Sequence, residues 1–146
     1  MAAVRRGAWV ALRYVTTIFF LGVIVQFFLV GVGLFGMKDG KTIDNASSLD
    51  PHRGFGFILG DGGAILTLVL VLLAWPTPRK LLGAWILLAV LAFVQPALAD
   101  FHHQWVGMFH PVNALLLLGL SGRLAHYAWT TRESGEVAAP ATAPTG

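Results

Sequence analysis

The chain has 146 residues, of which 56% are apolar and only 12% are charged. This charged share is about half that of an average soluble domain, which favours a membrane protein built as one domain. The absence of cysteine excludes disulfides, thiolate metal sites and covalent c-type haem attachment. The pI is near 9.8, but the basic residues are scattered rather than clustered, so nucleic acid is not an expected partner.

Four apolar stretches follow one another along the chain, and each is long enough to cross a bilayer. About 20 residues in a helix span a hydrocarbon core of roughly 30 Å. The sequence therefore predicts an all-α, integral membrane four-helix bundle within residues 1–129, with the polar stretch 37–53 as an external loop. A tail from 130 to 146, rich in Ala, Pro, Thr and Gly, has the composition of a disordered segment. The expected helices cover about residues 14–35, 54–75, 81–99 and 106–129.

The distribution of Lys and Arg between the predicted loops indicates how the helices cross the membrane. Placing the N-terminus inside puts seven basic residues on the cytoplasmic side and leaves three outside. Positive charge favours the cytoplasmic side, so we expect both termini in the cytoplasm and a multi-pass protein of the plasma membrane. The seven are Arg5, Arg6, Arg13, Arg79, Lys80, Arg123 and Arg132, and the three are Lys38, Lys41 and Arg53.

Two histidines head apolar stretches at the predicted outer ends of the second and fourth helices. His52 precedes the second stretch, and His110 opens the fourth within Phe-His-Pro-Val-Asn. Four-helix bundles build cofactor sites from facing helices, and a neutral imidazole is a good iron ligand. We therefore expect His52 and His110 to be the metal ligands of a b-type haem. The alternatives are a solvated loop histidine at 52 and a helix-start residue at 110.

Polar neighbours of the two histidines complete the expected haem site. Asp50 is expected to accept the second ring N–H of His52, and Arg53 to meet a haem propionate. Asn113 lies one turn beyond His110 and is assigned to the same cofactor-binding set. His102 and His103 in the outer link are expected to be solvated, and His126 belongs to the cytoplasmic end.

A glycine stripe follows His52 along the second helix. His52, Gly56, Gly60 and Gly63 share one helix face, and Gly56 and Gly60 form a G-x-x-x-G motif. Such a groove admits the backbone of a neighbouring helix. It would also clear space for a flat macrocycle, and both interpretations are open.

Three further polar residues are expected at membrane depth, where polar groups are costly and need a reason. Asp61 in the second helix either belongs to a proton path or a protein contact, or is a protonated carboxyl bonded to Gln26, Gln95 or Asn113. Gln26 and Gln95 are the expected buried polar residues of the first and third helices.

Several of these segments resemble an uncharacterised bacterial family of small four-helix membrane proteins, a domain of unknown function. The matching segments are 25–29, 51–56, 94–96 and 110–115. The placement of His52, Arg53 and His110 is also similar to one half of haem A synthase, whose halves each carry a histidine on the second and fourth helices. This chain has Asp50 where that motif has a Glu. The second resemblance implies haem binding rather than synthesis.

The sequence thus predicts a small membrane protein that binds haem b for electron transfer or haem handling, and favours a non-enzymatic role. A membrane subunit or scaffold without cofactor is the alternative, and a proton-conducting protein using Asp61 is a third. The expected partners are the lipid bilayer, a redox or membrane-protein partner and a second copy of the chain.

Overall fold

The computed structural model describes residues 1–76, 79–100 and 104–131, and within these ranges the regular structure is entirely helical. Four helical segments are long and apolar enough to cross a membrane, which confirms the predicted all-α class and the number of long helices. The elements are α1 (Ala2–Phe35), the 3₁₀ turn η1 (Ser47–Leu49), α2 (Asp50–Phe57), the π-helical turn η2 (Ile58–Gly62), α3 (Gly63–Ala74), α4 (Arg79–Asp100), α5 (Gln104–Gly107) and α6 (Phe109–Thr130).

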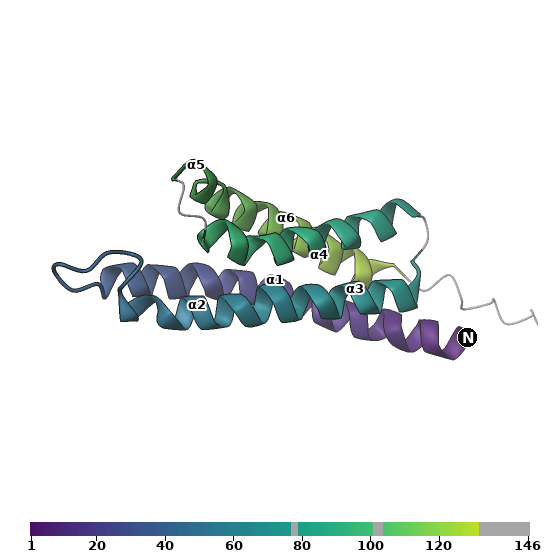
Figure 1. The fold of residues 1–146 in the computed structure, drawn as a ribbon. Helices are drawn as coiled ribbons and strands as arrows, with labels where there is room; N and C mark the ends of the chain where they lie inside the picture. Colours follow the sequence, from purple (N-terminus) through teal and green to yellow (C-terminus); the bar gives the residue numbers. More distant parts are fainter. Residues whose placement is uncertain (77–78, 101–103, 132–146) are drawn as a thin grey trace, which may run out of the picture.

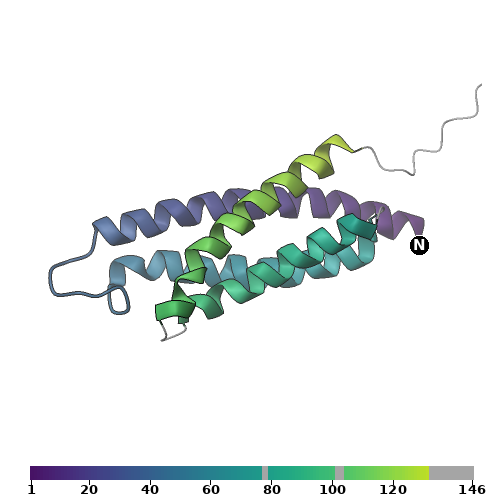
Figure 2. The ribbon, with the colours of Figure 1, turned by 90° about the horizontal axis from the view of Figure 1, so that it is seen from above.

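The helices pack as a bundle in which α2, η2 and α3 form one continuous rod (Figure 1). Helix α3 packs against α1 and α4, and α6 packs against the same two helices. The rod and α6 therefore occupy diagonally opposite corners, while α1 and α4 fill the other two. The N-terminus and the last turn of α6 lie at one end of the bundle, called here the N-terminal end (Figure 2). The loop after α1, the start of α2 and α5 lie at the opposite end, called the loop end.

Helix α1 begins at Ala2 rather than at the expected residue 14. No proline interrupts residues 2–13, and Ala8, Trp9 and Leu12 are buried against the bundle, so packing holds this basic segment in the helix. At 1.5 Å per residue the 34 residues of α1 extend about 51 Å, well beyond a hydrocarbon core of about 30 Å.

The second long helix begins at Asp50, before the expected residue 54. Pro51 stands in its first turn, where a missing backbone N–H has no cost. His52 is therefore a helical residue and not part of the preceding loop. The predicted tail beyond 131 and the predicted solvated residues His102 and His103 lie outside the described residues.

The tightest part of the core lies toward the N-terminal end. Trp85 of α4 is fully buried, and its indole N–H donates to the Thr16 hydroxyl over 3.1 Å. Thr16 in turn donates to the Leu12 carbonyl, so every polar atom of this contact is paired. Trp9 and Tyr127 pack edge-on against Trp85 from α1 and α6. One aromatic residue therefore joins three helices.

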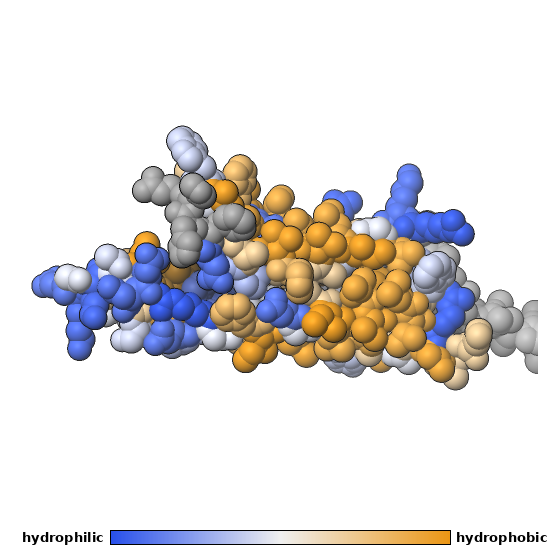
Figure 3. All heavy atoms as spheres, viewed as in Figure 1, coloured by the Kyte–Doolittle hydropathy of each residue, from blue (hydrophilic) through white to orange (hydrophobic). Residues whose placement is uncertain are grey.

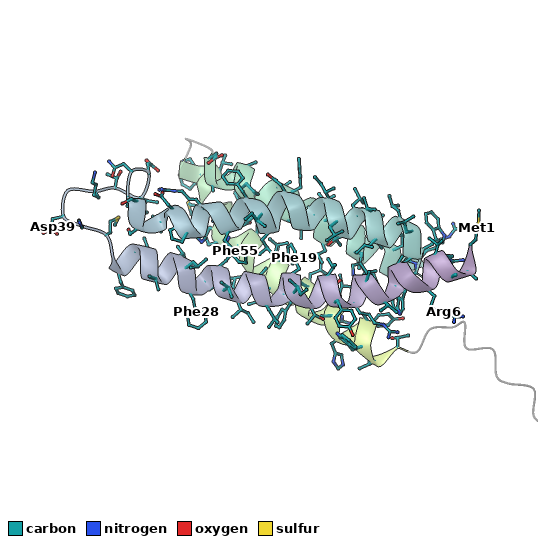
Figure 4. All side chains as sticks on the ribbon, turned by 90° about the horizontal axis from the view of Figure 1, so that it is seen from below. Met1, Arg6, Phe19, Phe28, Asp39 and Phe55 are labelled. Atoms are coloured by element: carbon teal, nitrogen blue, oxygen red, sulfur yellow. The ribbon has the colours of Figure 1, made fainter. Side chains whose placement is uncertain are left out.

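The outer surface is apolar along the middle of the bundle and hydrophilic near both ends (Figure 3). Figure 4 shows Met1 and Arg6 at one end and Asp39 at the other, with Phe28 pointing away from the neighbouring helices. Phe28 is 70% exposed, whereas Phe19, on the same helix, is 3% exposed. Large side chains therefore cover the outside of the bundle as well as its core, as in a protein surrounded by lipid.

Candidate functional site

The structure brings His52 and His110 together at the loop end. His52 lies in the first turns of α2, and His110 is the second residue of α6. Although these helices occupy opposite corners of the bundle, the two ring centroids are 6.3 Å apart and the ring planes meet at 81°. Both side chains are half-buried. The topology thus juxtaposes two imidazoles that are far apart in sequence.

Gln95 of α4 holds the His110 ring. Nδ1 of His110 lies 3.1 Å from the Gln95 backbone carbonyl, to which only an N–H can donate. The side-chain amide of Gln95 donates to the His110 carbonyl and lies 3.3 Å from Nε2 of the ring. These partners require the proton on Nδ1, which leaves the Nε2 lone pair as the acceptor. A backbone carbonyl on one nitrogen is a common device for orienting an imidazole whose other nitrogen binds a metal.

Asn113 holds the side chain of Gln95 in place. Its side-chain amide donates to Oε1 of Gln95 over 2.6 Å and to the Leu91 carbonyl over 2.8 Å. With only 6% of its surface exposed, Asn113 is the most buried polar residue near the two histidines. It therefore positions Gln95, and through it His110, rather than facing the space between the rings.

Substituting Asn113 with leucine should therefore loosen the junction of α4 and α6. Removing both hydrogen bonds leaves Oε1 of Gln95 without its donor and should lower the free energy of unfolding by about 1–2 kcal/mol. Reversible unfolding in bicelles would measure the change. Val112→Ala is the control, because Val112 is adjacent and 51% exposed. Equal stability of Asn113→Leu and the unaltered protein would contradict this role.

The His52 side chain has fewer hydrogen-bond partners than that of His110. Its backbone carbonyl accepts a hydrogen bond from the Gln26 amide over 3.1 Å. Nδ1 of the ring and Oε1 of Gln26 are both buried, and neither has a hydrogen-bond partner among the described residues. Buried polar atoms are nearly always paired, so these two unpaired atoms leave the His52 ring less firmly held than the His110 ring.

Asp50 and Arg53 have partners other than those predicted. Their side chains form an ion pair of 2.8 Å, because residues three apart share a face of α2. Arg53 also donates to the carbonyls of Ala46 and Ile43. Asp50 thus binds Arg53 instead of the His52 ring, and Arg53 holds the loop before α2, while its contact with a haem propionate stays a prediction.

Protein atoms fill the glycine stripe. A Cβ added at Gly56 would lie 2.8 Å from the Gln26 amide, and one at Gly63 would lie 3.0 Å from the Phe19 ring. At Gly60 it would lie 3.0 Å from Pro96 and 3.1 Å from the Ala92 carbonyl. The glycine stripe therefore serves close packing between helices, and in this structure it does not clear space for a macrocycle.

The predicted bond of Asp61 to Gln26, Gln95 or Asn113 is wrong. All three amides donate to the partners described above, and none reaches the Asp61 carboxylate. Among the described residues this carboxylate has neither a hydrogen bond nor an ion pair. His126 is exposed in the last turns of α6, far along the helix from His110 as expected.

The loop end is also the more loosely packed end of the bundle. Within the described ranges, α2 contributes no buried residue, α4 contributes none after Ala92, and α6 contributes none before Asn113. The residues around the two imidazoles therefore lack the closed core found around Trp85. Around Ala46 and Leu49, by contrast, the same end of the bundle is buried.

The bracing of His110 by Gln95 and Asn113 was not predicted as a unit. The signal in the sequence was depth, because Gln95 and Asn113 are polar residues expected in the same half of the membrane as His110. Comparison with family models, characterised proteins and solved structures finds no match to this chain. The resemblances noted from the sequence therefore stay predictions.

Proposed function

We propose that the chain is a multi-pass plasma-membrane protein, with both termini cytoplasmic, that binds one b-type haem between His52 and His110. The four long apolar segments support the membrane location. The excess of basic residues at the N-terminal end of the bundle supports the orientation. The loop end, with the two histidines, then faces the outside of the cell.

The observation that carries the haem proposal is the relation between the two rings. Metal–imidazole bonds of about 2 Å on each side put two ring centroids about 6 Å apart. The observed separation of 6.3 Å agrees with this value. The rings also come from opposite corners of the bundle, which is how four-helix bundles hold a cofactor in their interior.

The surrounding residues fit this role. The Gln95 carbonyl holds the proton of His110 on Nδ1, so Nε2 is the nitrogen available to iron. Binding there requires the Gln95 amide to turn away from Nε2, which it now approaches to 3.3 Å. A macrocycle bound between the two rings would fill the loosely packed region at the loop end. Two histidines fill both axial positions of a haem, which favours electron transfer or haem handling over oxygen chemistry.

The visible spectrum of the protein, purified in mild detergent from haem-replete cells, tests this proposal. We expect a Soret band and sharp α and β bands after reduction, with about one haem per chain by pyridine haemochrome assay. A colourless protein that also fails to bind added hemin during reconstitution would contradict the proposal. Membranes from cells carrying the empty vector provide the control for endogenous cytochromes.

A cofactor-free membrane subunit is the second candidate, and the filled glycine stripe favours it. Gly56, Gly60 and Gly63 all contact side chains of neighbouring helices, so they serve helix packing whether or not haem is present. In this alternative the hydrogen bonds among Gln95, His110 and Asn113 serve only to join α4 to α6. The same spectrum separates the two candidates.

A further inference from the structure

Asp61 lies in the middle of the second long helix, where a charge is most costly. Eleven residues separate it from Asp50 and thirteen from Ala74, which is about 17 Å and about 20 Å along the axis. Because Asp50 and Arg53 are charged, the apolar part of the rod begins near Gly54, and the carboxylate lies about 10 Å farther along, inside a hydrocarbon core of about 30 Å. An ionisable side chain at this depth needs a partner.

The face of the rod that bears Asp61 points out of the bundle. Ile58 and Ile65, three residues before and four after Asp61, are 70% and 59% exposed. Gly62, between them, is exposed, and a Cβ added there would meet no atom within 4 Å. Asp61 itself is partly exposed and has no partner among the described residues. Its face thus combines a polar group, an open glycine and two large apolar residues.

We propose that this face, defined by Ile58, Asp61, Gly62 and Ile65, is the interface between two copies of the chain in the bilayer. Copies with the same orientation in a membrane are related by a two-fold axis along the membrane normal. Such an axis brings together residues at equal depth, so Asp61 of one copy meets Asp61 of the other. A pair of carboxyls that shares a proton gives each copy the hydrogen-bond partner that it lacks alone.

The rest of the sequence supports a second copy as the occupant. Arg13 and Arg123 lie inside α1 and α6 but toward the N-terminal end of the bundle, where Arg13 donates to the Thr131 carbonyl. The other Lys and Arg residues are near the start of a helix, in the loop after α1 or at position 132, so no cation is expected at the depth of Asp61. A carboxyl is therefore the one ionisable group that a second copy presents there. Gly62 beside it allows the two helix backbones to approach closely, as small residues do in membrane helix pairs.

Single-molecule photobleaching in liposomes at increasing lipid dilution would measure the dimer directly. We expect two-step bleaching for the unaltered chain and at least a tenfold weaker association for Asp61→Leu. Asp61→Asn should remain dimeric, because a carboxamide pair also forms mutual hydrogen bonds. Gly62→Leu should weaken the dimer, whereas Gly83→Leu, at an exposed open glycine of α4, should not.

Cysteine cross-linking identifies the face independently. The chain has no cysteine, so Ile65→Cys introduces a single thiol, which should form a disulfide-linked dimer in the membrane under mild oxidation. Leu87→Cys, on α4 and 50% exposed, should not cross-link. A monomer at every lipid dilution, or a dimer as strong in Asp61→Leu as in the unaltered chain, would overturn the proposal. Helical content by circular dichroism verifies that each variant folds.

Discussion

Alanine in place of His52 or of His110 is expected to abolish the haem spectrum of the protein. The proposed site has one axial ligand on each of two diagonally opposite helices, and within the described residues no third histidine lies beside the pair. Each single substitution should therefore remove the sharp α and β bands of the reduced protein and lower haem content at least tenfold. Absorbance after reduction with dithionite would measure the bands, and the pyridine haemochrome assay would measure the content.

The controls for this experiment separate ligation from folding. His126→Ala changes an exposed histidine near the N-terminal end of the bundle and should leave the spectrum unchanged. Added imidazole should restore part of the Soret band in His110→Ala, because a free imidazole can occupy the vacated position. If both single variants kept a full haem complement, the two histidines would not be the ligands, even if the protein contained haem.

Leucine in place of Gly60 is expected to cause a large loss of stability. Gly60 is buried in η2 against Pro96 and the backbone carbonyl of Ala92, both on α4. Pro96 has no N–H to donate to the carbonyl four residues earlier, which is that of Ala92. The freed carbonyl and the proline ring leave no room for a side chain at position 60.

The size of this effect follows from the contacts that a side chain would make. A Cβ would already lie 3.0 Å from Pro96 and 3.1 Å from the Ala92 carbonyl, and backbone cannot move aside as a flexible side chain can. We expect Gly60→Leu to lower the free energy of unfolding by about 3 kcal/mol, the upper part of the range for overpacked cores. Thermal denaturation in detergent would report it. Gly83→Leu, with no atom within 4 Å, should be nearly neutral, and equal melting temperatures for the two variants would contradict the assigned contact.

The π-helical turn lies at this same contact. Residues 58–62 are wound more loosely than an α-helix, opposite the proline of α4. Such turns in helices are often found at functional sites. Here the turn contains both Gly60, which faces α4, and Asp61, which is partly exposed on the outside. One irregular turn therefore carries both a close contact with the backbone of α4 and the carboxyl of the proposed dimer interface.

The sequence alone determined the class and the coarse plan of this protein. Four apolar stretches, too long for core helices of a small domain, require helices because lipid offers no partner for unpaired backbone groups. The boundaries were less accurate. Helix α1 continues to Ala2 because Ala8, Trp9 and Leu12 find packing partners, and such contacts are invisible in a hydropathy profile.

The tertiary structure decided the partners of the polar residues. The order of the four apolar stretches placed His52 and His110 at the same end, but only the packing of the rod and α6 at opposite corners brings their rings to 6.3 Å. Asp50 binds Arg53, and Gln95 binds both His110 and Asn113. Hydrogen bonds require atoms within about 3 Å, and a residue pattern specifies the face and depth of a side chain without specifying its neighbour.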